Sequence, residues 1–343
     1  MSDALTGALA EALAELVTAV AACDDEVLDP DTAVEWLEMT GHTLGALPPA
    51  DRRTLDGLFR AVALRHPEGP WRDELLTLSE GFGLTGDIHA DACEAVAEHT
   101  RRFVTAVRDA DPATPVPTRP GRTLADLTRD LGTLHHWAGH LVRTRSRARV
   151  LPGDLPLGLP AEPAAHADWL AATADATVRT LRTADPDAPV WSPGGDPHVR
   201  SYPARLLRET LVHLADAGIA LRGEPDPADP RTAAEAVDDL LAELPYVPRA
   251  AEALARLDRD GAVIRLTAHD TGTGTGWTLV LGGGGFTWTR GTGEGPAVPA
   301  VRVGAGAGEL LLLLHGRFAA ADPRFLRTGD TELLDAWLAA TAL

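Results

Sequence analysis

Glu209 and His213 are the two side chains of this sequence whose types and spacing best suit metal chemistry. They lie four residues apart within the mostly apolar stretch Arg208–Asp216. Residues at this spacing share one face of a helix, so a carboxylate and an imidazole can bind one divalent metal together with a third ligand from a neighbouring helix. A solvated or ion-paired surface pair remains the alternative, because Glu-x-x-x-His spacing is common in helices.

The elements that must position this pair are long helices joined by Pro-rich connections. Apolar residues recur at helical spacing, and Thr123 is typical of a helix N-cap. Helices of this length with long crossings predict a bundle, a fold that builds metal sites from facing helices. The expected helices cover residues 92–107, 124–141, 165–181 and 203–217, with a shorter one at 232–244.

The residue patterns before and after the predicted bundle differ from those of the bundle itself. Residues 1–85 predict three helices at 5–20, 30–39 and 51–62, without a catalytic constellation, and we expect an accessory module for packing or for a protein partner. After residue 248, strand-like runs join through Gly-rich turns and two helices follow, which predicts a small α+β domain with an antiparallel sheet. The expected strands are 262–268, 277–281, 286–289 and 299–303, and the expected helices are 309–315 and 331–338.

The chain is therefore expected to be an α+β protein of three domains: a helical module at 1–85, a four-helix bundle at 88–247 and an α+β domain at 248–343. Its 343 residues are long enough for two or three domains, and 45% apolar with 24% charged residues is ordinary for a globular protein. The tetraglycine at 282–285 joins two strands and is not followed by Lys, so it indicates a hairpin turn and not a phosphate loop.

The charge of the chain argues against polyanionic partners. There are 50 acidic residues against 31 bases, a formal net charge of −19, which disfavours nucleic-acid backbones and anionic membranes. Every base is Arg, and Lys, Asn and Gln are absent, which is typical of a GC-rich and in particular an actinobacterial genome. Two distant cysteines, the lack of a signal segment and apolar runs too short to cross a bilayer predict a cytoplasmic protein.

Five stretches of the chain, which include Val116–Leu127, Arg208–Asp216 and Leu310–Arg317, resemble a known family. It is the mycothiol-dependent maleylpyruvate isomerase family, whose N-terminal half is a DinB-like metal-binding four-helix bundle. The similarity runs from about residue 88 to the C-terminus, in the order and spacing of the family, and excludes the first 85 residues. The stretches that carry it are Val116–Leu127, Leu131–Ala138, Asp185–Trp191, Arg208–Asp216 and Leu310–Arg317, with Gly329-Asp330.

This resemblance implies a metal site. In the family one His of the second bundle helix and the Glu and His of the Glu-x-x-x-His helix hold a divalent metal, usually zinc. Glu209 and His213 match the second pair, while the first His is replaced by Asp130. An Asp/Glu/His set can still bind zinc, although it also suits oxygen-loving ions such as Mn²⁺ or Fe²⁺. The alternative is that the metal is lost, since Arg208, which replaces a His of the family pattern, could pair with Glu209 in its place.

Four further residues are candidates for roles around this site. His135 matches a family position and is expected to line the pocket, or simply to belong to an amphipathic helix. Arg205, one turn before Glu209, could bind that carboxylate or the carboxylate of a ligand. Arg317 matches a Gly-Arg pair of the family and could clamp a carboxylate or form a structural salt bridge. Asp216 could fix an imidazole tautomer or be an exposed acid.

The function implied by the resemblance is that of a mycothiol-dependent transferase or isomerase that acts on a small electrophile. A Lewis-acidic metal would bind the thiol sulfur and lower its pKa, and the thiolate would add to the electrophile. The alternative is a degenerate, non-catalytic relative that binds a small ligand or a protein partner, with residues 1–85 as the recruiting element. The replacements at 119, 122, 130 and 208 favour this alternative, whereas the intact Glu209/His213 pair and Arg317 favour the enzyme.

Overall fold

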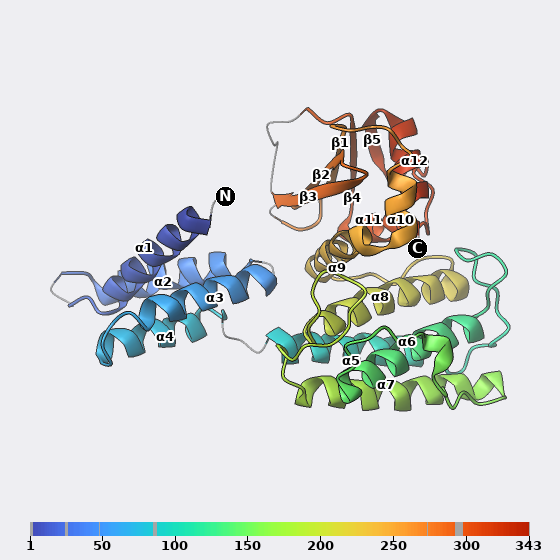
Figure 1. Cartoon of the computed structure of the whole chain (residues 1–343), viewed down its shortest axis with the longest axis horizontal. Coiled ribbons are helices and arrows are strands. Elements are labelled where there is room, and N and C mark those ends of the chain that lie inside the picture. The colour runs from blue at the N-terminus through green and yellow to red at the C-terminus, as the bar shows by residue number, and fades with distance from the viewer. Residues whose placement is uncertain are drawn as a thin grey trace. The chain divides into compact units, whose positions relative to one another are not determined.

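The structure is a computed structural model that describes residues 3–24, 27–47, 49–84, 88–272, 274–291 and 298–342. Its contacts divide the chain into two compact units, Met1–Asp91 and Ala92–Leu343. The predicted boundary between the accessory module and the bundle falls on residues 85–87, which lie outside the described residues. Figure 1 labels the elements of both units.

The first unit is helical, as predicted, but it contains a helix that the sequence analysis missed. Its helices are α1 (Asp3–Ala21), α2 (Pro30–Gly45), α3 (Pro49–Ala63) and α4 (Pro70–Gly81). The Asp29 carboxylate caps α2 by accepting a hydrogen bond from the Thr32 amide at 3.0 Å. The missed helix is α4, which begins at Pro70 and ends beside a Gly-rich segment. It contributes Leu75 to a small core that also holds Val17 and Phe59.

The second unit begins with the four long helices expected from the sequence. These are α5 (Ile88–Val107), α6 (Leu124–Thr144), α7 (His166–Thr183) and α8 (Ser201–Arg222), with short 3₁₀ turns at Pro152–Asp154 and Pro163–Ala165. Thr123 is the N-cap of α6, as predicted, and forms a reciprocal capping box with Asp126. The helix ends at Thr144, and its C-cap is Arg145, whose φ of 50° lies in the left-handed region.

Two glycines let α6 and α7 pack closely. A Cβ on Gly132 would lie 2.1 Å from the Trp169 ring, and a Cβ on Gly139 would lie 2.6 Å from the Thr177 hydroxyl. The earlier glycine of α6, Gly132, meets the earlier residue of α7, Trp169, and the later glycine, Gly139, meets the later residue, Thr177. The two helices therefore run parallel. The long connection from residue 145 to 165 is what returns the chain to the other end of the bundle.

The remainder of the unit is a mixed sheet with accompanying helices. The helices are α9 (Pro230–Glu243), α10 (Pro248–Leu254), α11 (Ala307–Leu314) and α12 (Thr331–Thr341), with a 3₁₀ turn at Leu244–Tyr246. The strands are β1 (Val263–Ala268), β2 (Gly276–Gly282), β3 (Gly285–Gly291), β4 (Val301–Ala305) and β5 (Leu326–Gly329), in the order β3-β2-β1-β4-β5.

The α+β class is confirmed, and the sheet is mixed: among the described strands three pairings are antiparallel, as predicted, and one is parallel. β1 and β4 pair in parallel, with Ile264 opposite Val301 and Leu266 opposite Val303. The other neighbours are antiparallel, including the β2–β3 hairpin at the tetraglycine turn. β2 pairs with only one edge of β1. The chain therefore crosses over the sheet after β3, and β4 pairs with the other edge of β1, whose buried backbone groups would otherwise have no hydrogen-bond partners.

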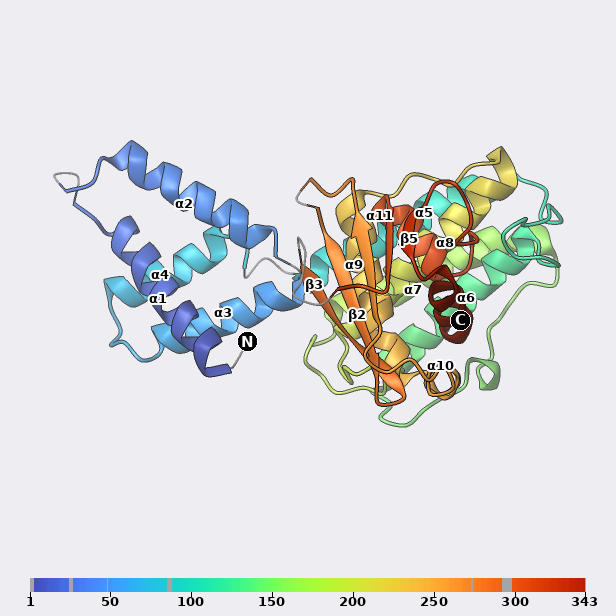
Figure 2. The same ribbon diagram turned by 90° about the horizontal axis from the view of Figure 1, so that it is seen from above.

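The bundle and the sheet region share one hydrophobic core. α9 packs on α8 and on α11, and a continuous cluster joins Tyr202 and Leu206 of α8 to Leu310 of α11 and Trp277 of β2. Figures 1 and 2 show the sheet region stacked on the bundle, with α9 at their boundary. In the described part of the chain, no helix is both long and apolar enough to span a bilayer.

Candidate functional site

α8 carries most of the predicted site residues along its buried length. It packs between α6 and α9, so its polar side chains face other helices instead of water. Arg208, His213 and Asp216 are all buried, and the side chain of Glu209 is 20% exposed. The pair predicted to bind metal therefore lies inside the protein and is not a solvated surface pair.

Arg208 lies at the centre of a buried group of charges. Its guanidinium is fully buried and donates from Nη1 to Asp239 at 2.7 Å, and from Nη2 to Glu209 at 3.0 Å and Glu243 at 2.7 Å. Arg205 also pairs with Glu243, and its guanidinium lies 5.9 Å from the Trp137 ring centroid. We call Arg205, Arg208, Glu209, Asp239 and Glu243 the α8 charge cluster. Arg205 is thus bound to Glu243, and not to Glu209 as one prediction had it.

The α8 charge cluster shifts the pKa values of its carboxyl groups in opposite directions. Burial disfavours the charged form of Glu209, but the charge of Arg208, followed by those of His315 and His213, outweighs it and lowers the pKa of Glu209. For Asp239 burial dominates and raises the pKa to about 6, even though Arg208 opposes it. Burial opposes the charge of Arg208 as well, yet the three carboxylates outweigh it and raise its pKa.

Three imidazoles lie close enough to Glu209 or to one another for their charges to interact: those of His135, His213 and His315. His213 Nδ1 lies 2.8 Å from the Glu209 carbonyl oxygen, so Nδ1 is the donor, and in the neutral form of the ring Nε2 is an acceptor. Within the described residues, this Nε2 and the Nε2 of His315 are buried and have no hydrogen-bond partner. Burial lowers the pKa of both His135 and His315 to about 3.

Asp130, the predicted third ligand, is engaged elsewhere. Its carboxylate pairs with Arg122, lies 3.6 Å from Arg119 and 3.6 Å from Arg129, and the hydrogen bond to Arg122 is the shortest of these contacts. Arg119 and Arg122 thus supply positive charges that neutralise Asp130.

The residues do not fit the three-ligand centre that the family implies. Among the residues that the structure describes, no three His, Cys, Asp or Glu side chains are arranged to hold a metal ion. Glu209 is bound by Arg208, and Asp130 is bound by arginines of its own end of α6. The metal-ligand roles of Asp130, Glu209 and His213 stay a prediction that this arrangement does not support.

Arg317 and Asp216 form a second buried ion pair. Arg317 Nε lies 3.0 Å from both carboxylate oxygens of Asp216, and its Nη1 donates to the His315 carbonyl oxygen at 2.8 Å. The Thr118 hydroxyl donates to Asp216 at 2.6 Å. Asp216 is therefore neither an exposed acid nor the partner of an imidazole. Arg317 therefore forms a structural salt bridge, which was one of its two predicted roles. The other role, binding the carboxylate of a ligand, stays a prediction.

Sequence reasoning missed three members of this site: Asp239, Glu243 and His315. Asp239 and Glu243 lie four residues apart on α9, so they share the face that meets α8. His315 follows the apolar run of α11 directly. The signal for all three was a polar residue next to a strongly apolar helical stretch, but only the fold reveals which partner each one meets.

His135 is the predicted site residue whose burial fits the expectation best. It is fully buried on α6, and its Nε2 lies 3.4 Å from the Thr100 hydroxyl of α5. The charge of His213 contributes to its lowered pKa, so the two imidazoles are neighbours across the bundle. The role predicted for His135, to line a ligand pocket, stays a prediction.

Comparison with known proteins identifies the bundle. Residues 93–218 match a family model described as the mycothiol maleylpyruvate isomerase N-terminal domain. The matched segment contains the described α6, α7 and most of α5 and α8, and it ends before α9 and the sheet region. The search of curated proteins found no match to the chain. Over residues 93–218 the bundle of this chain is therefore similar to the mycothiol maleylpyruvate isomerase N-terminal domain.

Proposed function

We propose that this chain is a non-catalytic member of its family that binds a small ligand, in the first place a low-molecular-weight thiol, without a metal ion. The observation that carries the proposal is the contact between Arg208 and Glu209. The guanidinium donates to the carboxylate at 3.0 Å and is itself fully buried among three acids. The Glu expected to bind metal thus already has a permanent cationic partner.

Electrostatics makes a metal at the same carboxylate unfavourable. Two like unit charges 4 Å apart repel by about 4 kcal/mol at the effective dielectric constant of a protein, and a divalent ion would roughly double this cost. Arg208 cannot be neutralised, because a guanidinium stays protonated in proteins and its pKa is raised further here. Moving Arg208 out of the cluster would also cost free energy, because the buried carboxylates of Asp239 and Glu243 would lose their hydrogen bonds to it.

The family of the bundle supports a thiol as the ligand. Without a cation to bind the sulfur, a thiol keeps a pKa near its usual value of about 8.5 and is mostly protonated at neutral pH. Binding of the thiol is therefore expected without its activation. The buried, neutral imidazoles of His135 and His315 would offer such a ligand hydrogen-bond acceptors.

One observation favours a second candidate, a metal- and mycothiol-dependent transferase or isomerase. The Nε2 of His213 is buried and, within the described part of the chain, has no hydrogen-bond partner, although it lies one turn from Glu209. A buried acceptor of this kind is costly unless something binds it. Zinc, Mn²⁺ or Fe²⁺ would bind to this Nε2 in the second candidate function. In the first, the bound thiol ligand would form a hydrogen bond with it.

The two candidates are separated by the metal content and the thiol affinity of the full chain purified without added ions. We expect less than about 0.1 metal ion per chain by mass spectrometry. We also expect binding of mycothiol in calorimetry that is unchanged by a chelator and weakened in His213→Ala. One metal ion per chain that is lost in both Glu209→Ala and His213→Ala, together with thiol binding that the chelator abolishes, would support the enzyme instead.

A further inference from the structure

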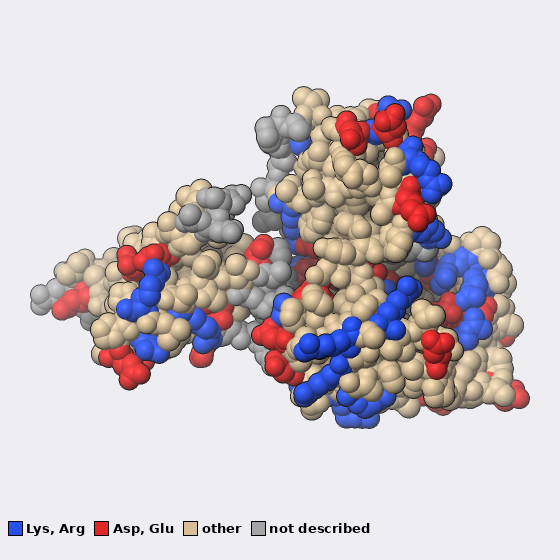
Figure 3. All heavy atoms as spheres, viewed as in Figure 1, with Lys and Arg blue, Asp and Glu red and all other residues tan. Residues whose placement is uncertain are grey.

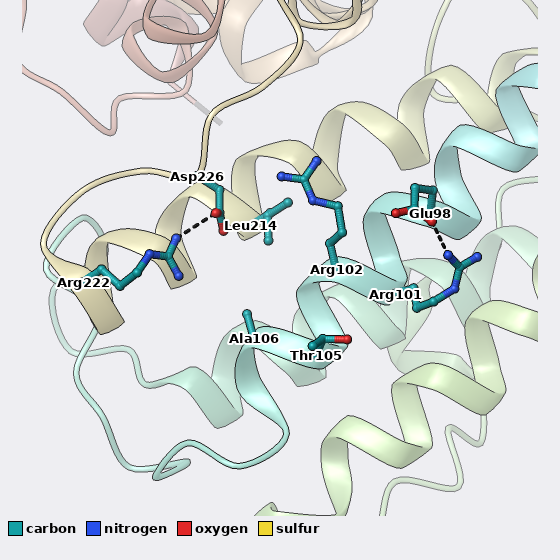
Figure 4. Close-up of a pocket in the computed structure, with 8 residues that line it drawn as sticks. All are labelled: Glu98, Arg101, Arg102, Thr105, Ala106, Leu214, Arg222 and Asp226. Carbon is teal, nitrogen blue, oxygen red and sulfur yellow. Dashed lines mark hydrogen bonds and ion pairs between the residues drawn. The ribbon is translucent and has the colours of Figure 1, made fainter.

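A groove on the bundle lies apart from the α8 charge cluster, between α5 and the C-terminal half of α8. It has a volume of about 340 Å³ and is drawn in Figure 4. This volume is at the small end of the range for pockets that bind small molecules. One wall is a single face of α5, whose residues recur every three or four positions: Glu98, Arg101, Arg102, Thr105 and Ala106.

The opposite wall depends on a glycine of α8. Arg222 and Asp226 close the groove, and a Cβ on Gly218 would lie 2.7 Å from the Asp226 amide nitrogen and 2.8 Å from Arg222 Nη2. Gly218 therefore lets the loop after α8 fold back against the helix. This loop carries Asp226 into an ion pair with Arg222 at 2.8 Å, which fixes the position of both side chains.

The charges that line the groove do not balance. Arg101 pairs with Glu98 and Arg222 pairs with Asp226, whereas no carboxylate within the described residues pairs with Arg102. Figure 4 shows Arg102 extending from α5 toward α8, opposite Arg222. Figure 3 shows arginines gathered in stripes over the bundle, although the chain as a whole has a formal charge of −19. The half-buried guanidinium of Arg102 is thus available to an anion in the groove.

Apart from Thr105, the uncharged part of the lining is apolar. Leu214 forms part of the groove while only 3% of its surface is exposed, and Ala106 faces the same space. An inorganic anion would meet Arg102 but would gain nothing from Leu214 and Ala106. An anion with an apolar body would use both parts of the groove, because the hydrophobic effect rewards each methylene that leaves water.

We propose that this groove binds a small organic monocarboxylate. The carboxylate accepts hydrogen bonds from the Arg102 guanidinium, whose planar fork matches it, and the apolar body lies over Leu214 and Ala106. Arg101 and Arg222 stay paired with Glu98 and Asp226, so the excess positive charge of the lining is that of Arg102. The groove shares no residue with the α8 charge cluster, so this inference goes beyond the proposed thiol function and can fail or hold independently of it.

The test is calorimetric titration of the full chain with hexanoate, with hexanol and inorganic phosphate as comparison ligands. We expect one hexanoate per chain, no detectable hexanol binding and clearly weaker phosphate binding. Arg102→Ala should weaken hexanoate binding by about tenfold, as expected for the loss of a charge-assisted hydrogen bond. Arg179→Ala removes an exposed Arg of α7 outside the groove and should leave the affinity unchanged.

Two further arms keep the test decisive if a variant folds poorly. Glu98→Gln frees Arg101 and should tighten hexanoate binding by about twofold, in line with the small worth of an exposed ion pair. In the unaltered protein, raising the salt concentration from about 0.05 to about 0.5 M should weaken binding. The proposal is overturned if hexanoate does not bind, if hexanol or phosphate binds as tightly, or if Arg102→Ala or salt leaves the affinity unchanged.

Discussion

Arg317 holds Asp216 by a guanidinium nitrogen that lies 3.0 Å from both carboxylate oxygens, although the two residues are 101 positions apart in the chain. Asp216 belongs to α8 of the bundle, and Arg317 follows α11 of the sheet region. The pair therefore fastens the C-terminal region to the bundle from within. It also fixes the segment that carries His315, because Arg317 donates to the His315 carbonyl oxygen.

We predict that Arg317→Ala destabilises the protein strongly. It would leave the fully buried carboxylate of Asp216 with the Thr118 hydroxyl as its remaining hydrogen-bond donor, and such a loss costs about 3–5 kcal/mol. Urea unfolding would measure the change in the free energy of unfolding. Arg256→Ala is the matched control, because Arg256 is 76% exposed and its pairing with Glu252 should be worth less than about 1 kcal/mol. Equal effects of the two substitutions would contradict the clamp.

The pH dependence of stability follows from the buried imidazoles. Burial lowers the pKa of His135 and His315 from 6.5 to about 3, so both contribute stability that is present above pH 6.5 and is lost as the pH falls toward 3. Asp239 acts in the opposite sense. Its pKa is raised from 3.8 to about 6, so it contributes stability that is present below pH 3.8 and is lost as the pH rises through 6.

Two imidazoles outweigh one carboxyl group, so we expect these groups to lower the free energy of unfolding by about 1 kcal/mol per pH unit as the pH falls from about 6 to about 4. Denaturant unfolding at several pH values would measure this slope. His315→Asn should reduce it, whereas replacement of the exposed His42 by Asn should not. A slope that His315→Asn leaves unchanged would show that this imidazole does not titrate as described.

Gly132→Ala should destabilise the bundle through the contact between α6 and α7. The added methyl group would overlap the Trp169 ring, and overpacking of this kind costs about 1–3 kcal/mol. Thermal unfolding of the variant would reveal the loss. Gly153→Ala is a suitable control, since a Cβ there would meet nothing within 4 Å. If both variants unfold at the same temperature, the close approach of the two helices is not a constraint.

Much of the fold could be predicted because it follows from local patterns. Periodic apolar residues and the Thr123 cap gave the bundle helices, and alternating apolar runs gave four of the five strands. The parallel pairing of β1 with β4 could not be predicted in this way, because strand order depends on how the chain crosses the sheet. β5 (Leu326–Gly329) has too few residues to show a periodic pattern.

The candidate site was predictable mainly along α8, although His135 of α6 and Arg317 after α11 were also expected there. Glu209 and His213 lie on one helix, so their spacing in the sequence was enough to predict that they are neighbours. The pairing of Arg208 with Glu209 was predicted as one of two alternatives. Asp239, Glu243 and His315 reach the site from α9 and from the end of α11, and their role depends on packing between elements. Asp130 was assigned by counting along a motif, which could not reveal that Arg119 and Arg122 would engage it.

The Arg208 guanidinium supplies the positive charge beside Glu209 that a bound metal ion would otherwise supply. Zinc titration of the unaltered protein, beside an Arg208→His/Asp239→Asn variant in which the loss of a cation and of an anion balance, tests this claim most directly. We predict no Glu209-dependent zinc binding by the unaltered protein and a gain of affinity in the variant. One zinc ion bound by the unaltered protein and lost in Glu209→Ala would contradict the account.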